Sequence, residues 1–118
     1  TLLRSGARLA FGSDFPIEEV NPLLGLYAAI TRQDADGRPR GGWLPDQRLT
    51  AEEALRAFTT GAAYAGFEED QRGMLRPGMS ADLTIFDGAV LDAKPGELLG
   101  RKVIATMVGG RFVYGPVK

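Results

Sequence analysis

The stretch Ala7-Arg8-Leu9-Ala10-Phe11-Gly12-Ser13-Asp14-Phe15-Pro16 is a short apolar run that ends abruptly in small and polar residues. A mostly apolar run of this length is typical of a strand in a parallel sheet that is covered on both faces. Phe15-Pro16 then turns the chain away from the strand direction. The sequence therefore predicts a buried strand over residues 7–11 and a fold of the α/β class.

Asp14 follows directly after this predicted strand. The carboxyl ends of parallel strands are where α/β folds gather their reactive groups, so Asp14 is a candidate catalytic residue. Aspartates after strands also commonly cap the next turn of the chain. The spacing alone leaves both roles open.

Two helices are predicted on either side of a long polar loop. The first starts at Asn21-Pro22, because asparagine is a strong N-cap and proline suits the first helical position. The second starts with the capping box Thr50-Ala51-Glu52-Glu53, and Gly66 is expected to be its left-handed C-terminal cap. Residues 33–48 between them predict a surface loop, and loops of this length are often functional.

The last part of the chain predicts antiparallel strands. One strand is expected from about residue 81 to residue 86, and two more flank Gly109-Gly110. Because both glycines can take positive φ, this pair is a strong hairpin signal. Asp82 is expected to have a structural role, accepting hydrogen bonds from the backbone amides of residues 77–80.

The composition excludes several kinds of site. The chain has no cysteine and no histidine, so it contains no disulfide, no cysteine nucleophile and no imidazole metal ligand. Its net charge of −1 and the lack of a dense cationic cluster argue against a nucleic-acid partner. No apolar run is long enough for a membrane span or a signal peptide, so we expect a cytoplasmic protein without a membrane partner.

Seven segments together resemble the C-terminal part of the amidohydrolase superfamily, specifically amidohydrolase family 3. They include Gly12-Ser13-Asp14 and Ala81-Asp82-Leu83, and their order and spacing cover nearly all 118 residues. The matching segments are residues 11–16, 26–32, 49–55, 59–65, 72–78, 81–87 and 103–114.

The resemblance implies a (β/α)8 metal-hydrolase barrel and a smaller composite β-sandwich built from both chain ends. Residues 1–72 would be the last barrel strand with its following helices, and residues 73–118 would be later strands of the sandwich. Gly12-Ser13-Asp14 matches the end of the eighth barrel strand. There the aspartate touches the metal or its bound water and acts as general base and proton shuttle. The implied cofactor is a divalent metal, with zinc expected, and the implied substrate is a small molecule with an amide, formamide or cyclic amide bond.

The chain departs from the family pattern in its metal ligands. The family uses a His-x-His pair, further histidines and in some members a lysine, whereas this chain has no histidine. Lys94, Lys102 and Lys118 all follow the barrel segment, so none matches that lysine. Asp14 is thus the one expected metal-contacting residue. The expected partners are a missing N-terminal part of the same polypeptide and, because barrel edges would be open, a second copy of the chain.

Two further interpretations stay open from the sequence. Trp43 either helps to shape the substrate pocket or simply pins the long loop to the surface or to a neighbouring subunit. For the whole chain, the alternative to an enzyme segment is a non-enzymatic α+β module that serves assembly or binding. An upstream in-frame segment carrying His-x-His would decide for the enzyme.

We predict that the 118-residue chain alone is catalytically inactive, because one carboxylate without further ligands should bind zinc weakly. The measurement is an assay of the purified chain with zinc or manganese and simple amides. Metal-dependent turnover above background would contradict the prediction.

Overall fold

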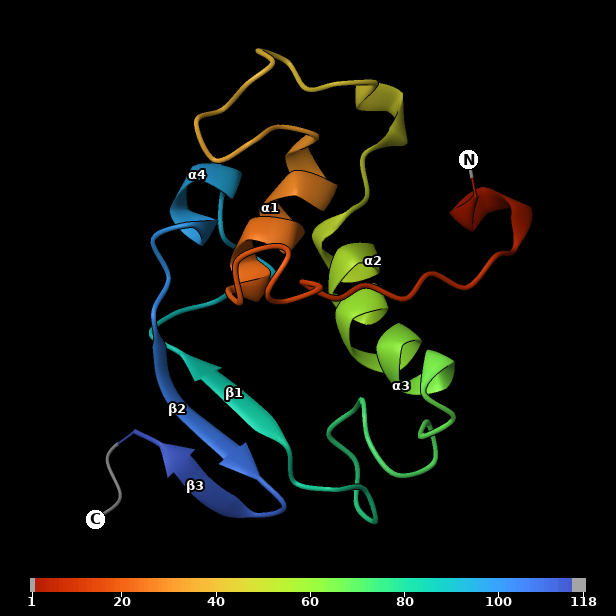
Figure 1. The fold of residues 1–118 in the computed structure, drawn as a ribbon, viewed down its shortest axis with the longest axis vertical. Helices are drawn as coiled ribbons and strands as arrows, with labels where there is room; N and C mark the ends of the chain where they lie inside the picture. Colours follow the sequence, from red (N-terminus) through yellow and green to blue (C-terminus); the bar gives the residue numbers. More distant parts are fainter. Residues whose placement is uncertain (1, 116–118) are drawn as a thin grey trace.

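The computed structural model describes residues 2–115, and Thr1 and residues 116–118, Lys118 among them, lie outside this description. Its helical elements, shown in Figure 1, are the 3-10 helices η1 (Leu3–Ser5) and η2 (Pro45–Gln47), the π-helical turn η3 (Ala57–Gly61), and the α-helices α1 (Pro22–Thr31), α2 (Ala51–Arg56), α3 (Ala62–Ala65) and α4 (Pro95–Leu98). No helix within residues 2–115 is long and apolar enough to cross a bilayer.

The three strands form one antiparallel sheet in the order β1-β2-β3. They are β1 (Leu83–Phe86), β2 (Val103–Val108) and β3 (Arg111–Tyr114), so the first begins at Leu83 rather than near residue 81. Gly109 and Gly110 connect β2 to β3 with φ angles of 54° and 80°. The predicted hairpin is confirmed, because both glycines take the positive φ that a tight two-residue turn demands.

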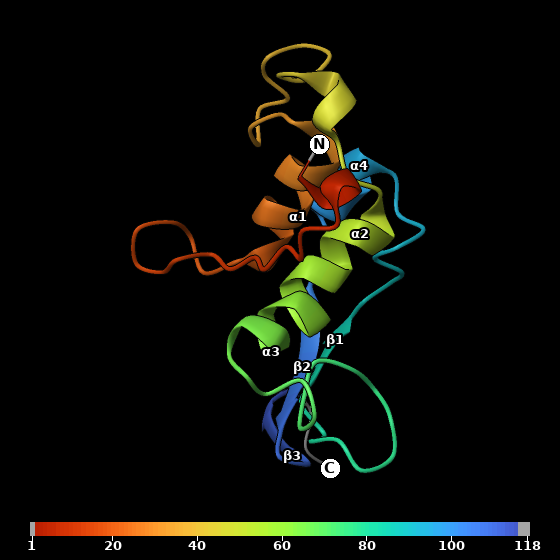
Figure 2. The same ribbon diagram turned by 90° about the vertical axis from the view of Figure 1, so that its right-hand side faces the viewer.

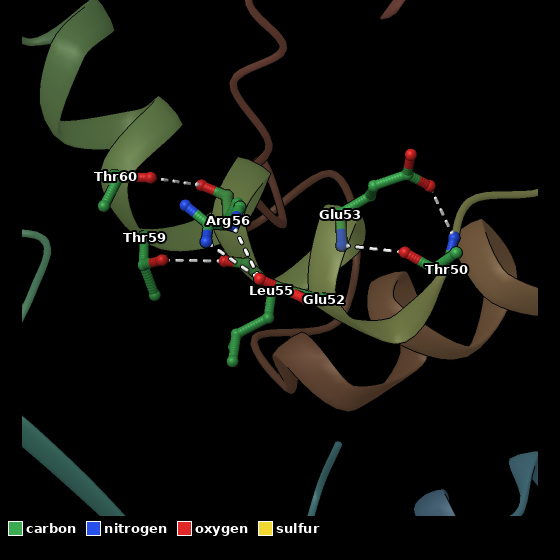
Figure 3. Close-up of polar contacts among 7 residues, drawn as sticks. All are labelled: Thr50, Glu52, Glu53, Leu55, Arg56, Thr59 and Thr60. Carbon is green, nitrogen blue, oxygen red and sulfur yellow. Dashed lines mark hydrogen bonds and ion pairs between the residues drawn. The ribbon is translucent and has the colours of Figure 1, made fainter. Parts of the chain in front are cut away.

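The predicted helix starts are also confirmed. The side chain of Asn21 accepts a hydrogen bond from the backbone N–H of Leu23 at 3.0 Å, at the start of α1. At the start of α2, the hydroxyl of Thr50 accepts from the N–H of Glu53 at 3.2 Å (Figure 3). The carboxylate of Glu53 accepts from the N–H of Thr50 at 2.8 Å, which completes the capping box.

The end of the second helix differs from the prediction. Gly66 has φ −86°, so it is not the left-handed cap, and its N–H still donates to the helical carbonyls of Ala62 and Ala63. Phe67 takes the positive φ of 57° instead. Its side chain is 91% exposed and does not make the apolar contact expected beside such a cap.

The main core joins the helices to the sheet region. Leu23 of α1 and Leu98 of α4 are each 1% exposed, and Ala54 of α2 is fully buried beside them. Phe86, at the end of β1, packs against the same cluster. In Figures 1 and 2 the sheet lies at the opposite end of the molecule from the long loop after α1. The core at α1, α2 and α4 therefore connects residues from both sides of the expected boundary at residues 72 and 73.

The prediction of a strand over residues 7–11 is wrong for this structure. The segment runs past the helix labelled α2 and α3 toward the start of α1 (Figure 1) and pairs with no strand among the described residues. It is attached by one backbone hydrogen bond, from the N–H of Phe11 to the carbonyl of Ala57 at 3.0 Å. A strand needs a neighbouring strand to form its hydrogen-bond ladder. Because β1, β2 and β3 pair with one another, no strand within residues 2–115 is paired with residues 7–11.

Replacing Leu23 with alanine should lower the free energy of unfolding by about 2–5 kcal/mol, because it empties a fully packed site between three helices. The matched control is Leu75→Ala, since Leu75 is 78% exposed. Urea unfolding should show a clearly larger loss of unfolding free energy for Leu23→Ala than for Leu75→Ala. Equal losses of unfolding free energy in the two variants would contradict the core described above.

Candidate functional site

Asp14 ends the extended segment in a turn before α1. Its φ is 53°, a left-handed conformation that aspartate tolerates better than most residues. Its backbone carbonyl accepts from the N–H of Ile17 at 2.9 Å and closes the turn. The side chain is exposed and, within residues 2–115, makes no hydrogen bond or ion pair. The carboxylate therefore does not cap the turn, and its oxygens are available to a ligand or a proton.

A cavity of about 430 Å³ lies beside this turn. Residues 12–13 form one side of it, while Asp14 itself is not among the lining residues, and the N-cap Asn21 with Leu24, Gly25 and Ala28 of α1 forms another side. These four residues share a helix face because they are spaced three or four apart. The cavity thus runs along α1 from the turn beside Asp14 toward the start of the long loop.

The polar lining of this cavity is acidic. Glu18, Glu19 and Asp34 contribute carboxylates, and among residues 2–115 no arginine or lysine lines it. Asp34 is already engaged, because its Oδ1 accepts from the backbone N–H groups of Asp36 at 3.0 Å and Arg38 at 2.9 Å. The sequence did not predict that Glu18 and Glu19 line this cavity, because both follow a turn whose path the sequence does not determine.

The described residues do not form a complete metal centre. Within residues 2–115 there is no group of three histidine, cysteine, aspartate or glutamate side chains that could hold a metal ion. Catalytic zinc sites use three protein ligands and an open position. Asp14 fits one contact of such a site, because its carboxylate is exposed and unengaged, but it does not make a site alone.

Trp43 contacts the end of α1. Its backbone N–H donates to the carbonyl of Arg32 at 2.8 Å, and the side-chain Nε of Arg32 donates to the backbone carbonyl of Trp43 at 3.0 Å. The Arg32 guanidinium also lies 4.8 Å from the centroid of the indole ring, within the range of a cation–π interaction. The indole is still 62% exposed. These contacts fasten the loop to α1.

The structure does not bring Trp43 and Asp14 together. Asp14 precedes the first residue of α1, whereas Trp43 packs on the residue that caps its other end. The ten residues of α1 correspond to a helix about 15 Å long. Trp43 also does not line the cavity beside Asp14.

The long loop is held by its own side chains. The amide of Gln33 donates to the carbonyls of Gly37 at 2.6 Å and Pro39 at 3.1 Å. Arg48 donates to the carbonyls of Thr31 and Gly41. At Gly42, whose φ is 82°, a Cβ atom would lie 2.3 Å from the carbonyl oxygen of Thr31. Residues 33–48 therefore form a compact loop folded against the end of α1.

Asp82 has a structural role with partners other than those expected. Its Oδ1 accepts from the N–H of Gly109 at 2.7 Å, which ties it to the hairpin turn rather than to residues 77–80. Its Oδ2 lies 3.8 Å from the guanidinium of Arg72. Asp82 thus links β1, the β2–β3 turn and the segment after α3.

The sequence profile of the amidohydrolase family matches residues 1–114, and the chain belongs to this family.

Known relatives and one solved structure are similar along nearly the whole chain. The "Putative amidohydrolase YtcJ" of Bacillus subtilis is 32% identical over 97% of this chain and 22% of its own length. The "N-substituted formamide deformylase" of Arthrobacter pascens is 32% identical over 97% of this chain and 20% of its own. The Arabidopsis thaliana protein LONG AFTER FAR-RED 3 is 35% identical over 97% of this chain and 19% of its own.

A crystal structure of an amidohydrolase from Thermotoga maritima shares the fold. It superposes with a TM-score of 0.65 and 22% identity, covering 98% of this chain and 25% of that one. The chain therefore spans about a fifth of the length of these curated relatives and a quarter of the solved structure.

Replacing Trp43 with alanine should loosen residues 33–48, because it removes the indole that the Arg32 guanidinium covers. The measurement is limited trypsin cleavage after Arg40, which should be several-fold faster than in the parent protein. Unchanged cleavage together with a raised KM in the full-length enzyme would instead favour a role in the substrate pocket.

Proposed function

We propose that the polypeptide containing this chain hydrolyses a carbon–nitrogen bond of a small molecule, other than a peptide bond, with Asp14 as general base and proton shuttle. The single observation that carries the proposal is the unpaired, exposed carboxylate of Asp14, directly after the cavity-lining residues Gly12 and Ser13. Membership of the amidohydrolase family supports the reaction class. The formamide deformylase among the relatives supports a formamide, next to simple and cyclic amides, as the substrate class.

In this proposal Asp14 moves one proton. Its carboxylate takes the proton from the attacking water as the oxygen bonds to the carbonyl carbon, and then delivers it to the leaving nitrogen as the carbon–nitrogen bond breaks. A divalent metal, with zinc expected, would polarise the carbonyl and acidify the water when bound. The exposed position of Asp14 suits this task, because a general base must come within hydrogen-bond reach of the water.

The remaining metal ligands are assigned to other parts of a longer polypeptide. The relatives are about five times longer than the matched region, which leaves ample chain for them. In the same proposal residues 1–72 belong to the barrel and residues 73–118 to the small β-sandwich. The shared core of Leu23 and Leu98 would hold the two parts in a fixed relation.

Replacing Asp14 with asparagine in the full-length protein should lower kcat for its amide substrate by about 10²–10⁴-fold. The reason is that the asparagine side chain, unlike a carboxylate, cannot take a proton from water. Asp70→Asn is the matched control, since Asp70 is also an exposed aspartate of the chain. Steady-state kinetics on both variants checks the prediction, and an Asp14→Asn protein as active as the control would overturn the proposed role.

A further inference from the structure

A π-helical turn interrupts the helix that begins at the capping box. It spans Ala57–Gly61, between α2 and α3. The hydroxyl of Thr59 donates to the carbonyl of Leu55 at 2.8 Å, and that of Thr60 donates to the carbonyl of Arg56 at 3.2 Å (Figure 3). Such threonine bonds to the preceding turn bend helices, and π turns occur frequently at functional sites.

The π turn is also where the extended segment before Asp14 touches the helix. The N–H of Phe11 donates to the carbonyl of Ala57 at 3.0 Å. A Cβ atom on Gly61 would lie 2.1 Å from the carbonyl oxygen of Leu9, so the two backbones are in direct contact. Gly61 is therefore needed because any side chain would push the segment away.

Phe58 adds a side-chain contact at the same place. Its ring meets the ring of Phe11 edge to face, with 5.5 Å between centroids and 76° between planes. On its other side the ring lies against α1, where a Cβ atom on Gly25 would be 2.6 Å from its Cζ. Phe58 is thus held between α1 and the segment, and it also lines the cavity beside Asp14.

We propose that the π turn at residues 57–61 positions Asp14 by fixing the segment that carries it. This inference rests on the proposed function of Asp14, and Gly61 and Phe58 act as its positioning residues. Three contacts fix residues 9–11, three to five residues before the carboxylate. A displacement of about 1 Å at a catalytic group costs up to about 10²-fold in rate.

The test is Gly61→Ala in the full-length protein, with Gly96→Ala as the matched control. Gly96 also lies in a helix, but a Cβ atom there would meet nothing within 4 Å. We expect Gly61→Ala to lower kcat by about 10–100-fold with KM unchanged, and to speed hydrogen exchange at the amide of Phe11. The Gly96→Ala control should change neither quantity.

A double-mutant cycle with Asp14→Asn separates positioning from general damage. If Gly61 acts through Asp14, the variant carrying both changes should be no slower than Asp14→Asn alone, whereas independent effects would multiply. If Gly61→Ala does not fold, Phe58→Leu replaces it in the cycle, because leucine keeps apolar volume while removing the ring contact with Phe11.

Two results would overturn the positioning proposal: multiplied effects in the cycle, or unchanged exchange at Phe11 in a Gly61→Ala protein with reduced kcat. Failure of the proposed function gives a different pattern, because Asp14→Asn would then retain activity. In that case faster hydrogen exchange at the Phe11 amide of the Gly61→Ala protein would still support the anchoring of residues 9–11 by the π turn. Unchanged hydrogen exchange there would refute this anchoring.

Discussion

The close approach of two backbones at Gly61 is the constraint on which the placement of Asp14 depends. The carbonyl of Leu9 faces Gly61 of the helix at a distance that leaves no room for a Cβ atom, and two residues further along the segment the N–H of Phe11 donates to the carbonyl of Ala57. Backbone contacts of this kind specify position tightly, because they involve no flexible side chain. The left-handed turn at Asp14 then begins from a fixed point rather than from a free end.

The apolar core connects this arrangement to the rest of the chain. Leu23 is the second residue of α1, the helix that follows the Asp14 turn, and Leu98 comes from α4, far along the sequence. Phe86 brings the end of β1 to the same cluster. Because burial of these side chains is the main source of stability here, the sheet and the helices are held together by the helix that follows the candidate catalytic residue.

The polar side chains around the site separate into engaged and unengaged groups. Arg32 is occupied by Trp43, and Asp82 by Gly109 and Arg72, so both have structural partners. Asp14 has none within residues 2–115. An exposed carboxylate without a partner has no stabilising role in the described structure, so its oxygens are open to a ligand or a proton.

The sequence by itself determined the features that depend on near neighbours in the chain. The caps at Asn21 and Thr50 and the hairpin at Gly109-Gly110 form as predicted, because their bonds join residues at most three positions apart or need only a local φ angle. The order and spacing of the seven matching segments also identified the family. Tertiary structure decided the rest: within residues 2–115 no strand pairs with residues 7–11, and Asp82 bonds to an amide 27 residues away. Such contacts depend on which distant segments pack together, and local propensity carries no information about that.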